Sequence, residues 1–174
     1  AYRLLRGDNK KAPQLTLKTA LFSAALLVPL QIFVGDLHGL NTLEHQPQKV
    51  AAMEGLWETQ KGAPLVLFAL PDEENRQNRF ALEVPKLASL ILTHQLDGEL
   101  QGLNDFKGEH PPVAPVFYSF RLMVGIGLLM LLIAWWCSAR LYRHGSLTPL
   151  QLKLLVGMTF SGWVATLAGW YVTE

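Results

Sequence analysis

The chain has 174 residues, of which 50% are hydrophobic and 17% charged, and its 15 Lys and Arg nearly balance its 14 Asp and Glu. A nucleic-acid-binding domain normally carries a strong basic surplus, so this balance argues against a nucleic-acid partner. The one cysteine, Cys137, excludes a disulfide framework and any zinc or iron–sulfur site that needs several cysteines.

Three long apolar segments dominate the chain: residues 19–34, 113–137 and 150–174. A helix needs roughly 20 residues to cross about 30 Å of hydrocarbon, so the second and third segments are long enough and the first is short for a span. The alternative is that they are buried helices of a globular protein, but so short a chain has too few amphipathic elements to cover them. We therefore expect an all-α membrane protein with three transmembrane helices.

The charge distribution predicts how these segments cross the membrane. Residues 1–18 are strongly basic, and the connection at residues 138–149 is basic as well, so both should face the cytoplasm. Residues 35–112 instead hold 12 acidic and 6 basic residues and should form a long extracytoplasmic loop. Residues 1–18 resemble the cytoplasmic end of a preceding helix with its connecting loop, and we expect the sequence to be a fragment of a larger membrane protein.

Proline positions predict order within the outer loop. Pro47 suits the first turn of a helix that would run to about Thr59, and Pro85 suits the start of a second helix with an apolar stripe. Between them, the apolar run 65–70 predicts one short strand. Asp36, which follows the first span directly, could cap the element after it.

Arg121 has the most costly position in the chain, eight residues into the second apolar segment. A charge at that depth costs a few kcal/mol or more by insertion scales, so it requires an anionic partner such as a carboxylate or a cofactor propionate. The alternative is that the side chain extends to the outer interface. Met123 is either a packing residue or a ligand of haem iron. On an ideal helix the two residues point about 200° apart, so both could serve one cofactor only if Arg121 curled toward its rim.

Two further pairs of residues are candidates for function. Lys49 and Glu54 flank a small apolar patch, residues 50–53, that could lie against a lipid-soluble ligand, although both could also be solvated surface charges. Glu174 ends the third span, where an interfacial carboxylate needs no further role, and Trp170 lies one helical turn before it on the same face.

Four stretches of the sequence resemble subunit I of the cytochrome bd quinol oxidase family, in the same order and at compatible spacing. The first is GDLHGLNTLEHQP at residues 35–47, which continues through KVAAMEGLWE at residues 49–58. The others are residues 80–85 with 90–94, residues 113–124 and residues 162–174. The resemblance covers the chain almost end to end, and the first stretch and the short loop are most similar to the cyanide-insensitive branch.

The resemblance implies a role for each candidate residue in the loop and the second span. Lys49 would hydrogen-bond a quinone oxygen, and Glu54 would accept a proton as quinol is oxidised. Met123 would ligate a low-spin haem b opposite a histidine, and Arg121 would offset the charge of that haem's propionate. The histidine is expected shortly before Ala1, so the fragment by itself should be inactive.

The third span would contribute to a second haem site. Glu174 would ligate a high-spin haem b, with Trp170 next to it, and the third haem would be haem d or another haem b. A Gly-Arg-Gln-Pro-Trp motif is expected after this span. The whole subunit, together with subunit II, would oxidise ubiquinol or menaquinol at the outer loop of a bacterial inner membrane. It would reduce oxygen to water and so generate proton motive force.

Two other functions stay open at the level of sequence. A non-redox transporter or receptor with an outer domain could use Arg121 and Glu174 as a structural ion pair. A membrane anchor with two haems that feeds a dehydrogenase would need paired histidines on its spans, which these spans lack. Visible absorption of the full-length protein would separate a haem protein from the transporter.

Overall fold

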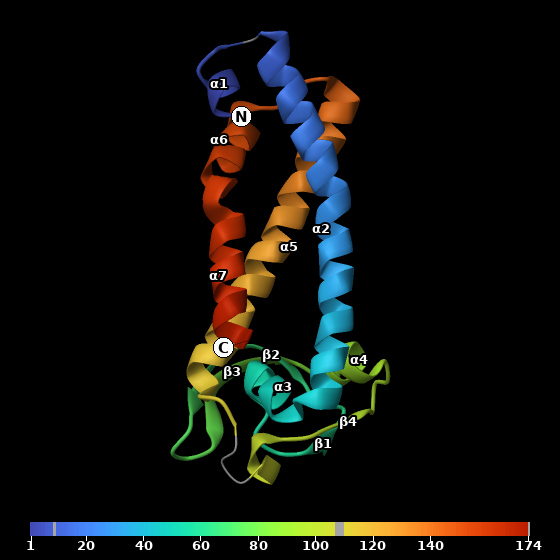
Figure 1. Cartoon of the computed structure of the whole chain (residues 1–174), viewed down its shortest axis with the longest axis vertical. Helices are drawn as coiled ribbons and strands as arrows, with labels where there is room; N and C mark the ends of the chain where they lie inside the picture. Colours follow the sequence, from blue (N-terminus) through green and yellow to red (C-terminus); the bar gives the residue numbers. More distant parts are fainter. Residues whose placement is uncertain (9, 107–109, 174) are drawn as a thin grey trace. The chain divides into compact units, whose positions relative to one another are not determined.

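The computed structural model describes residues 1–8, 10–106 and 110–173. Its helices are α1 (Tyr2–Leu5), α2 (Lys11–His45), α3 (Pro47–Glu54), α4 (Leu87–Thr93), α5 (Val113–His144), α6 (Pro149–Gly157) and α7 (Ser161–Thr173), with the short 3-10 helices η1 (Leu103–Phe106) and η2 (Met158–Phe160). Its strands are β1 (Gln60–Lys61), β2 (Leu65–Asp72), β3 (Gln77–Val84) and β4 (Glu99–Leu100). Figure 1 shows these elements coloured in chain order.

The chain divides into two compact units. The first unit consists of Ala1–Val34 and Met123–Leu167, and the second unit consists of Gly35–Leu122 and Ala168–Glu174. The long helices α2 and α5 each contribute residues to both units.

Three helical segments among the described residues are long and apolar enough to cross a membrane: Lys11–His45, Val113–His144 and Pro149–Thr173. The predicted fold class, a mainly helical membrane protein with three spans, is therefore confirmed. The third segment is not one uninterrupted α-helix, because η2 separates α6 from α7.

Helix α2 continues well beyond residue 34, where the sequence led us to expect the span to end. Gly35 and Gly39 lie inside the helix, and the helix stops at His45 because Pro47 disfavours the helical conformation in the residue before it, Gln46, which has φ −140°. Asp36 is thus an interior helical residue, and the prediction that it caps a following element is wrong.

In the first unit, the N-terminal half of α2 packs against the C-terminal half of α5, as Figure 1 shows. Leu21, Ile133 and Cys137 are buried together at this contact. The indole N–H of Trp135 donates to the carbonyl oxygen of Ala25 at 3.0 Å, and the Ser138 hydroxyl donates to the carbonyl oxygen of Leu21 at 3.3 Å. The indole of Trp135 thus binds the neighbouring helix.

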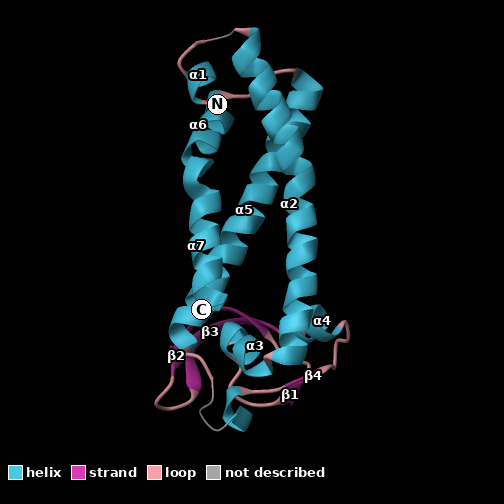
Figure 2. Ribbon diagram, in the orientation of Figure 1, coloured by secondary structure: helices cyan, strands magenta, loops and turns pink. Residues whose placement is uncertain are grey.

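The second unit combines the short helices α3 and α4 with two antiparallel ladders, β2 with β3 and β1 with β4 (Figure 2). The strand predicted at residues 65–70 is confirmed as β2, whereas β3 and the β1–β4 pair had no sequence signal that we recognised. The β2–β3 turn is held by Asp72, whose carboxylate accepts from the backbone N–H of Asn75 at 3.1 Å and forms an ion pair with Arg79.

Both predicted loop helices exist but are shorter than expected. Helix α3 ends at Glu54, not near Thr59, because Gly55 adopts the left-handed conformation with φ 65° and directs the chain away. Helix α4 starts at Leu87 because Lys86 also has a positive φ, 62°.

The core of the second unit forms around α3. Residues 50–53 are all buried, together with Trp57, Leu103, Val116 and Val172. The small apolar patch that the sequence offered to a lipid-soluble ligand therefore packs against the chain itself. The first turn of α5 joins this core, and the Glu73 carboxylate accepts from the backbone N–H groups of Val113 and Ala114 at 2.9 and 3.4 Å, which caps the helix.

Candidate functional site

Glu54 and Arg121 meet in the interior of the second unit. Glu54 is the last residue of α3 and Arg121 lies two turns into α5, and Arg121 Nη2 is 3.5 Å from Glu54 Oε2. The two side chains are 7% and 17% exposed, which excludes a solvated surface charge at Glu54. The structure thus gives Arg121 the carboxylate partner that its position requires. The transporter alternative had instead paired it with Glu174, which lies outside the described residues.

Arg121 also caps the C-terminal end of α3. Its guanidinium donates to the carbonyl oxygens of Met53 and, at 3.5 Å, of Glu54, groups that have no partner within the helix. On its other side it donates to the carbonyl oxygen of Val66 in β2, from Nε at 2.8 Å and from Nη2 at 2.5 Å. One cation therefore joins α3, β2 and α5, and its charge is placed favourably at the negative end of the α3 dipole.

The side chain of Arg121 lies over the Phe117 ring and reaches back toward the start of α5. The guanidinium carbon is 3.5 Å from the centre of that ring, and Nη1 donates to the Phe117 carbonyl oxygen at 3.4 Å. This direction agrees with the alternative in which the side chain extends from the span toward polar groups at its end. The five N–H groups of the guanidinium are matched by five contacts to the carbonyl oxygens of Val66, Met53, Phe117 and Glu54, so the arrangement offers no uncommitted N–H to a propionate.

The electrostatics of Glu54 combine two opposing effects. Burial penalises the carboxylate and raises the pKa of Glu54 above its usual 4.5, while the positive charge of Arg121 acts in the lowering direction. At the same time, Oε2 is buried without a hydrogen-bond partner among the described residues. Because a buried acceptor without a donor is costly, this oxygen is suited to accept a proton or a hydrogen bond from a bound molecule.

Lys49 lies in the first turn of α3, and its side chain reaches the C-terminal end of α7. Its ammonium group donates to the carbonyl oxygen of Thr173, the last residue of α7, at 3.0 Å. A cation is stabilising at a helix C-terminus, where backbone carbonyls lack intrahelical partners. The structure therefore places Lys49 at the end of α7 and Glu54 at Arg121, not side by side along one open apolar patch.

The turn after Glu54 is built by residues that the sequence analysis did not single out. The Asn78 amide of β3 donates to the Gly55 carbonyl oxygen at 2.8 Å and accepts from the Trp57 indole N–H at 3.0 Å. A Cβ on Gly55 would lie 2.9 Å from the Phe117 ring, so that ring fits against this glycine. The β-strand prediction stopped short of β3, and no motif marks Asn78.

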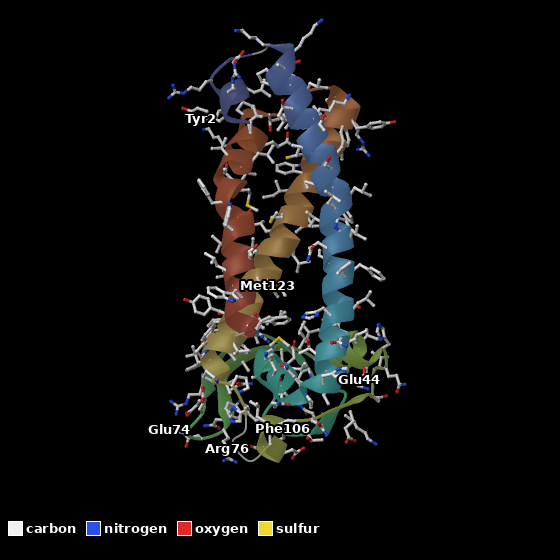
Figure 3. The ribbon with its side chains drawn as sticks, in the orientation of Figure 1. Tyr2, Glu44, Glu74, Arg76, Phe106 and Met123 are labelled. Carbon is white, nitrogen blue, oxygen red and sulfur yellow. The ribbon has the colours of Figure 1, made fainter. Side chains whose placement is uncertain are left out.

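The remaining predicted residues lie away from Glu54 and Arg121, or are not among the residues that the structure describes. Met123 is a half-buried residue of α5, labelled in Figure 3, and helix geometry places it about 200° around the axis from Arg121. Trp170 lies on α7, is 59% exposed, and its ring centre is 6.4 Å from that of Tyr171. Glu174 is not among the described residues. Within the described part of the chain, His, Cys, Asp and Glu form no group of three that could hold a metal ion.

Comparison with known proteins connects this arrangement to one family. The family model for cytochrome bd terminal oxidase subunit I matches residues 1–174. The chain is 26% identical to cytochrome bd-II ubiquinol oxidase subunit 1 of Escherichia coli (strain K12), over all of this chain and 47% of that protein. It is 31% identical to cytochrome bd ubiquinol oxidase subunit 1 of Bacillus subtilis (strain 168), over 80% of this chain and 32% of that one.

A solved structure gives the same result. The bd oxidase from Geobacillus thermodenitrificans superposes with a TM-score of 0.78 at 33% identity, over 98% of this chain and 40% of that one. The chain spans less than half the length of these relatives. Because the family model matches the whole sequence, the chain belongs to the cytochrome bd terminal oxidase subunit I family.

Proposed function

We propose that this chain is the quinol-oxidising part of the catalytic subunit of a terminal oxidase, and that Glu54 accepts the proton that quinol releases. The observation that carries the proposal is the buried Oε2 of Glu54, which has no hydrogen-bond donor among the described residues and lies 3.5 Å from Arg121. The relatives' names support the substrate class, since they are ubiquinol oxidases.

The chemistry fits a general base for a hydroxyl group. A base works best when its pKa lies near the operating pH, and burial moves the pKa of Glu54 in that direction from 4.5. Arg121 would keep the carboxylate anionic and fixed. Lys49 would donate to the oxygen at the other end of the carrier ring. Its ammonium has three N–H groups, and the bond to Thr173 uses one of them.

Met123 would supply an axial ligand to a low-spin haem b. A thioether on a half-buried face of α5 suits that role, and a haem held by Met and His supplies an electron acceptor of raised potential. The committed hydrogen bonds of Arg121 favour its action on Glu54 over a direct contact with a propionate. Glu174, with Trp170 beside it, would serve a high-spin haem b. A third haem, haem d or haem b, would be held by residues outside this chain.

The membrane arrangement is part of the same proposal. Residues 35–112 would lie outside the bacterial inner membrane, and residues 1–18 and 138–149 in the cytoplasm, with spans at 19–34, 113–137 and 150–174. Protons from quinol would then be released outside, while oxygen is reduced to water with protons drawn from inside. Charge would separate across the membrane without a pump. Subunit II would be the protein partner.

Replacing Glu54 with Gln in the full-length assembled oxidase tests the proposal. The amide keeps the shape but cannot take the proton, so quinol-driven oxygen consumption should fall by about 10²-fold or more, within the range for loss of a general base. Oxygen consumption driven by an artificial electron donor should stay unchanged, because it bypasses the quinol site.

The matched control is Glu58→Gln, an exposed glutamate four residues later, which should leave both activities as they are. Equal loss of quinol-driven and donor-driven activity in Glu54→Gln would mean that Glu54 is structural, and full quinol activity would end the proposal.

A further inference from the structure

We infer that Asn78 is a positioning residue for quinol oxidation, which holds the turn after α3 so that the Glu54 carboxylate stays against Arg121. The inference rests on the proposed function of Glu54. Asn78 lies in β3, whereas Glu54 and Arg121 lie in α3 and α5. Its side chain reaches the turn after Glu54 through two hydrogen bonds.

The backbone of the turn at residues 55–57 explains why one amide matters. The carbonyl oxygens of the three residues that follow α3 each accept one hydrogen bond. The Leu56 and Trp57 carbonyls accept from the backbone N–H groups of Leu103 and Asn104, at 2.9 and 3.0 Å. The Gly55 carbonyl instead accepts from a side chain, the Asn78 amide, at 2.8 Å. That side chain thus completes the hydrogen bonding of the turn.

Asn78 contacts the turn at both of its ends. Its amide nitrogen binds the Gly55 carbonyl and its amide oxygen accepts from the Trp57 indole N–H at 3.0 Å. The two bonds also define which end of the amide is which, because a carbonyl can only accept and an indole N–H can only donate. A hydrocarbon side chain of similar size makes neither bond.

Displacement of this turn would reach Glu54 directly. Gly55 is the next residue, it has φ 65°, and it lies under the Phe117 ring, whose face carries the Arg121 guanidinium. Arg121 in turn caps the carbonyls of Met53 and Glu54. The end of α3 and the start of β3 therefore share one hydrogen-bond network. In it, Asn78 binds the Gly55 carbonyl, and Arg121 binds the carbonyls of Met53 and Glu54.

The charged groups near Glu54 determine how a shift of the turn at residues 55–57 would change the protonation of its carboxylate. Arg121 on α5 is the charge that acts on the carboxylate. Lys49 on α3 itself is directed to the Thr173 carbonyl of α7, and Asp105 of η1 accepts from the Thr59 hydroxyl. If the turn moves, Glu54 loses its ion pair and retains its burial, so its carboxylate becomes easier to protonate.

The test is Asn78→Leu, a neutral replacement of similar size, in the full-length oxidase assembled in membranes. We expect the kcat for quinol oxidation to fall roughly tenfold, because two buried groups lose their partners. We also expect the acid limb of the pH–rate profile to move to higher pH by roughly one unit, the size of effect that a lost ion pair produces. Haem content and donor-driven oxygen consumption per haem should be unchanged.

Asn104→Leu is the matched control, because the Asn104 side chain is exposed and its amide oxygen binds the Arg76 side chain, at 3.4 Å. It should change neither rate nor profile. A lower rate in Asn78→Leu with the acid limb in its original place would show that Asn78 only supports folding, and would overturn the inference.

A second variant decides the matter if Asn78→Leu does not assemble. Trp57→Phe removes the indole N–H and leaves the bond to Gly55, so it should move the acid limb in the same direction by a smaller amount. An unmoved limb in Trp57→Phe would then overturn the inference. The proposed function is refuted by a different result, namely full quinol activity in Glu54→Gln. If Glu54→Gln is defective but the acid limb stays in place in Asn78→Leu and Trp57→Phe, only the role of Asn78 is refuted.

Discussion

Arg121 can lie in the largely apolar helix α5 because its guanidinium group contacts polar groups outside that helix. The side chain turns toward the start of α5, where the Met53 and Val66 carbonyls and the Glu54 carboxylate surround it. A buried ion pair recovers its desolvation cost only when further hydrogen bonds satisfy the remaining donors, and here backbone carbonyls do so. Within the described residues, Glu54 keeps one carboxylate oxygen without a hydrogen-bond donor, whereas Arg121 has acceptors for its guanidinium.

The proposed role of Glu54 predicts a pH dependence for quinol oxidation. If the Glu54 carboxylate is the base, activity should be lost as the pH falls through its pKa, which burial raises above 4.5. Arg121→Gln removes the charge that opposes this rise, so the acid limb of the pH–rate profile should move to still higher pH. Arg79→Gln, at an exposed arginine paired with Asp72, should leave the limb in place. A limb that moves to lower pH in Arg121→Gln would contradict the assignment of Glu54 as the base.

Met123 carries a separate prediction at the residue scale. If its thioether ligates the low-spin haem b, Met123→Leu keeps the packing volume but removes the ligand, and the absorption bands of that haem should be lost in the intact oxidase. Met130→Leu, two turns further along α5, should leave the spectrum as it is. An unchanged spectrum in Met123→Leu would exclude Met123 as a ligand.

At the scale of elements, the end of α3 determines where the Glu54 carboxylate lies. Gly55 ends the helix in a left-handed turn in which the Leu56 N–H returns to the Ala51 carbonyl at 2.9 Å. This ending turns the chain away directly after Glu54, under Phe117. The β2–β3 hairpin then closes over the helix end through Val66 and Asn78. A longer helix, as the sequence led us to expect, would carry residues 55–59 through that space.

Gly55→Ala should therefore disturb both stability and activity. The added Cβ requires a left-handed alanine and meets the Phe117 ring at 2.9 Å, which together should cost about 2–4 kcal/mol. We expect a lower Tm of the purified oxidase and a raised KM for quinol. The control is Gly62→Ala, which has nearly the same φ, 64°, but no neighbour closer than 3.4 Å. If both variants lose the same stability, backbone strain alone explains the loss and the contact with Phe117 is unimportant.

At the scale of the whole molecule, the boundaries of the two units agree with the charge pattern. The second unit contains the acidic segment expected outside the membrane, and the first contains both basic segments expected inside. Many large apolar side chains of the three spans are exposed, among them Leu26, Leu132 and Trp163.

Cysteine labelling tests this arrangement. In a Cys137→Ala background, Glu74→Cys places a thiol at the exposed β2–β3 turn marked in Figure 3, and Ser146→Cys places one between α5 and α6. In intact cells with a permeable outer layer, a membrane-impermeant maleimide should label position 74 and not position 146. The reverse pattern would invert the proposed topology.

The sequence by itself determined the three spans and the strand at residues 65–70, and its charge pattern and candidate residues gave the predictions for polarity and site. These are local properties, since hydropathy and charge are read within a window of the chain. It missed β3, the length of α2, the turn at Gly55 and the hydrogen bonds of Asn78. The ion pair of Glu54 with Arg121 joins residues 67 positions apart. Only the tertiary structure decided it, because a charge inside a folded unit takes whichever partner the packing of distant elements brings near.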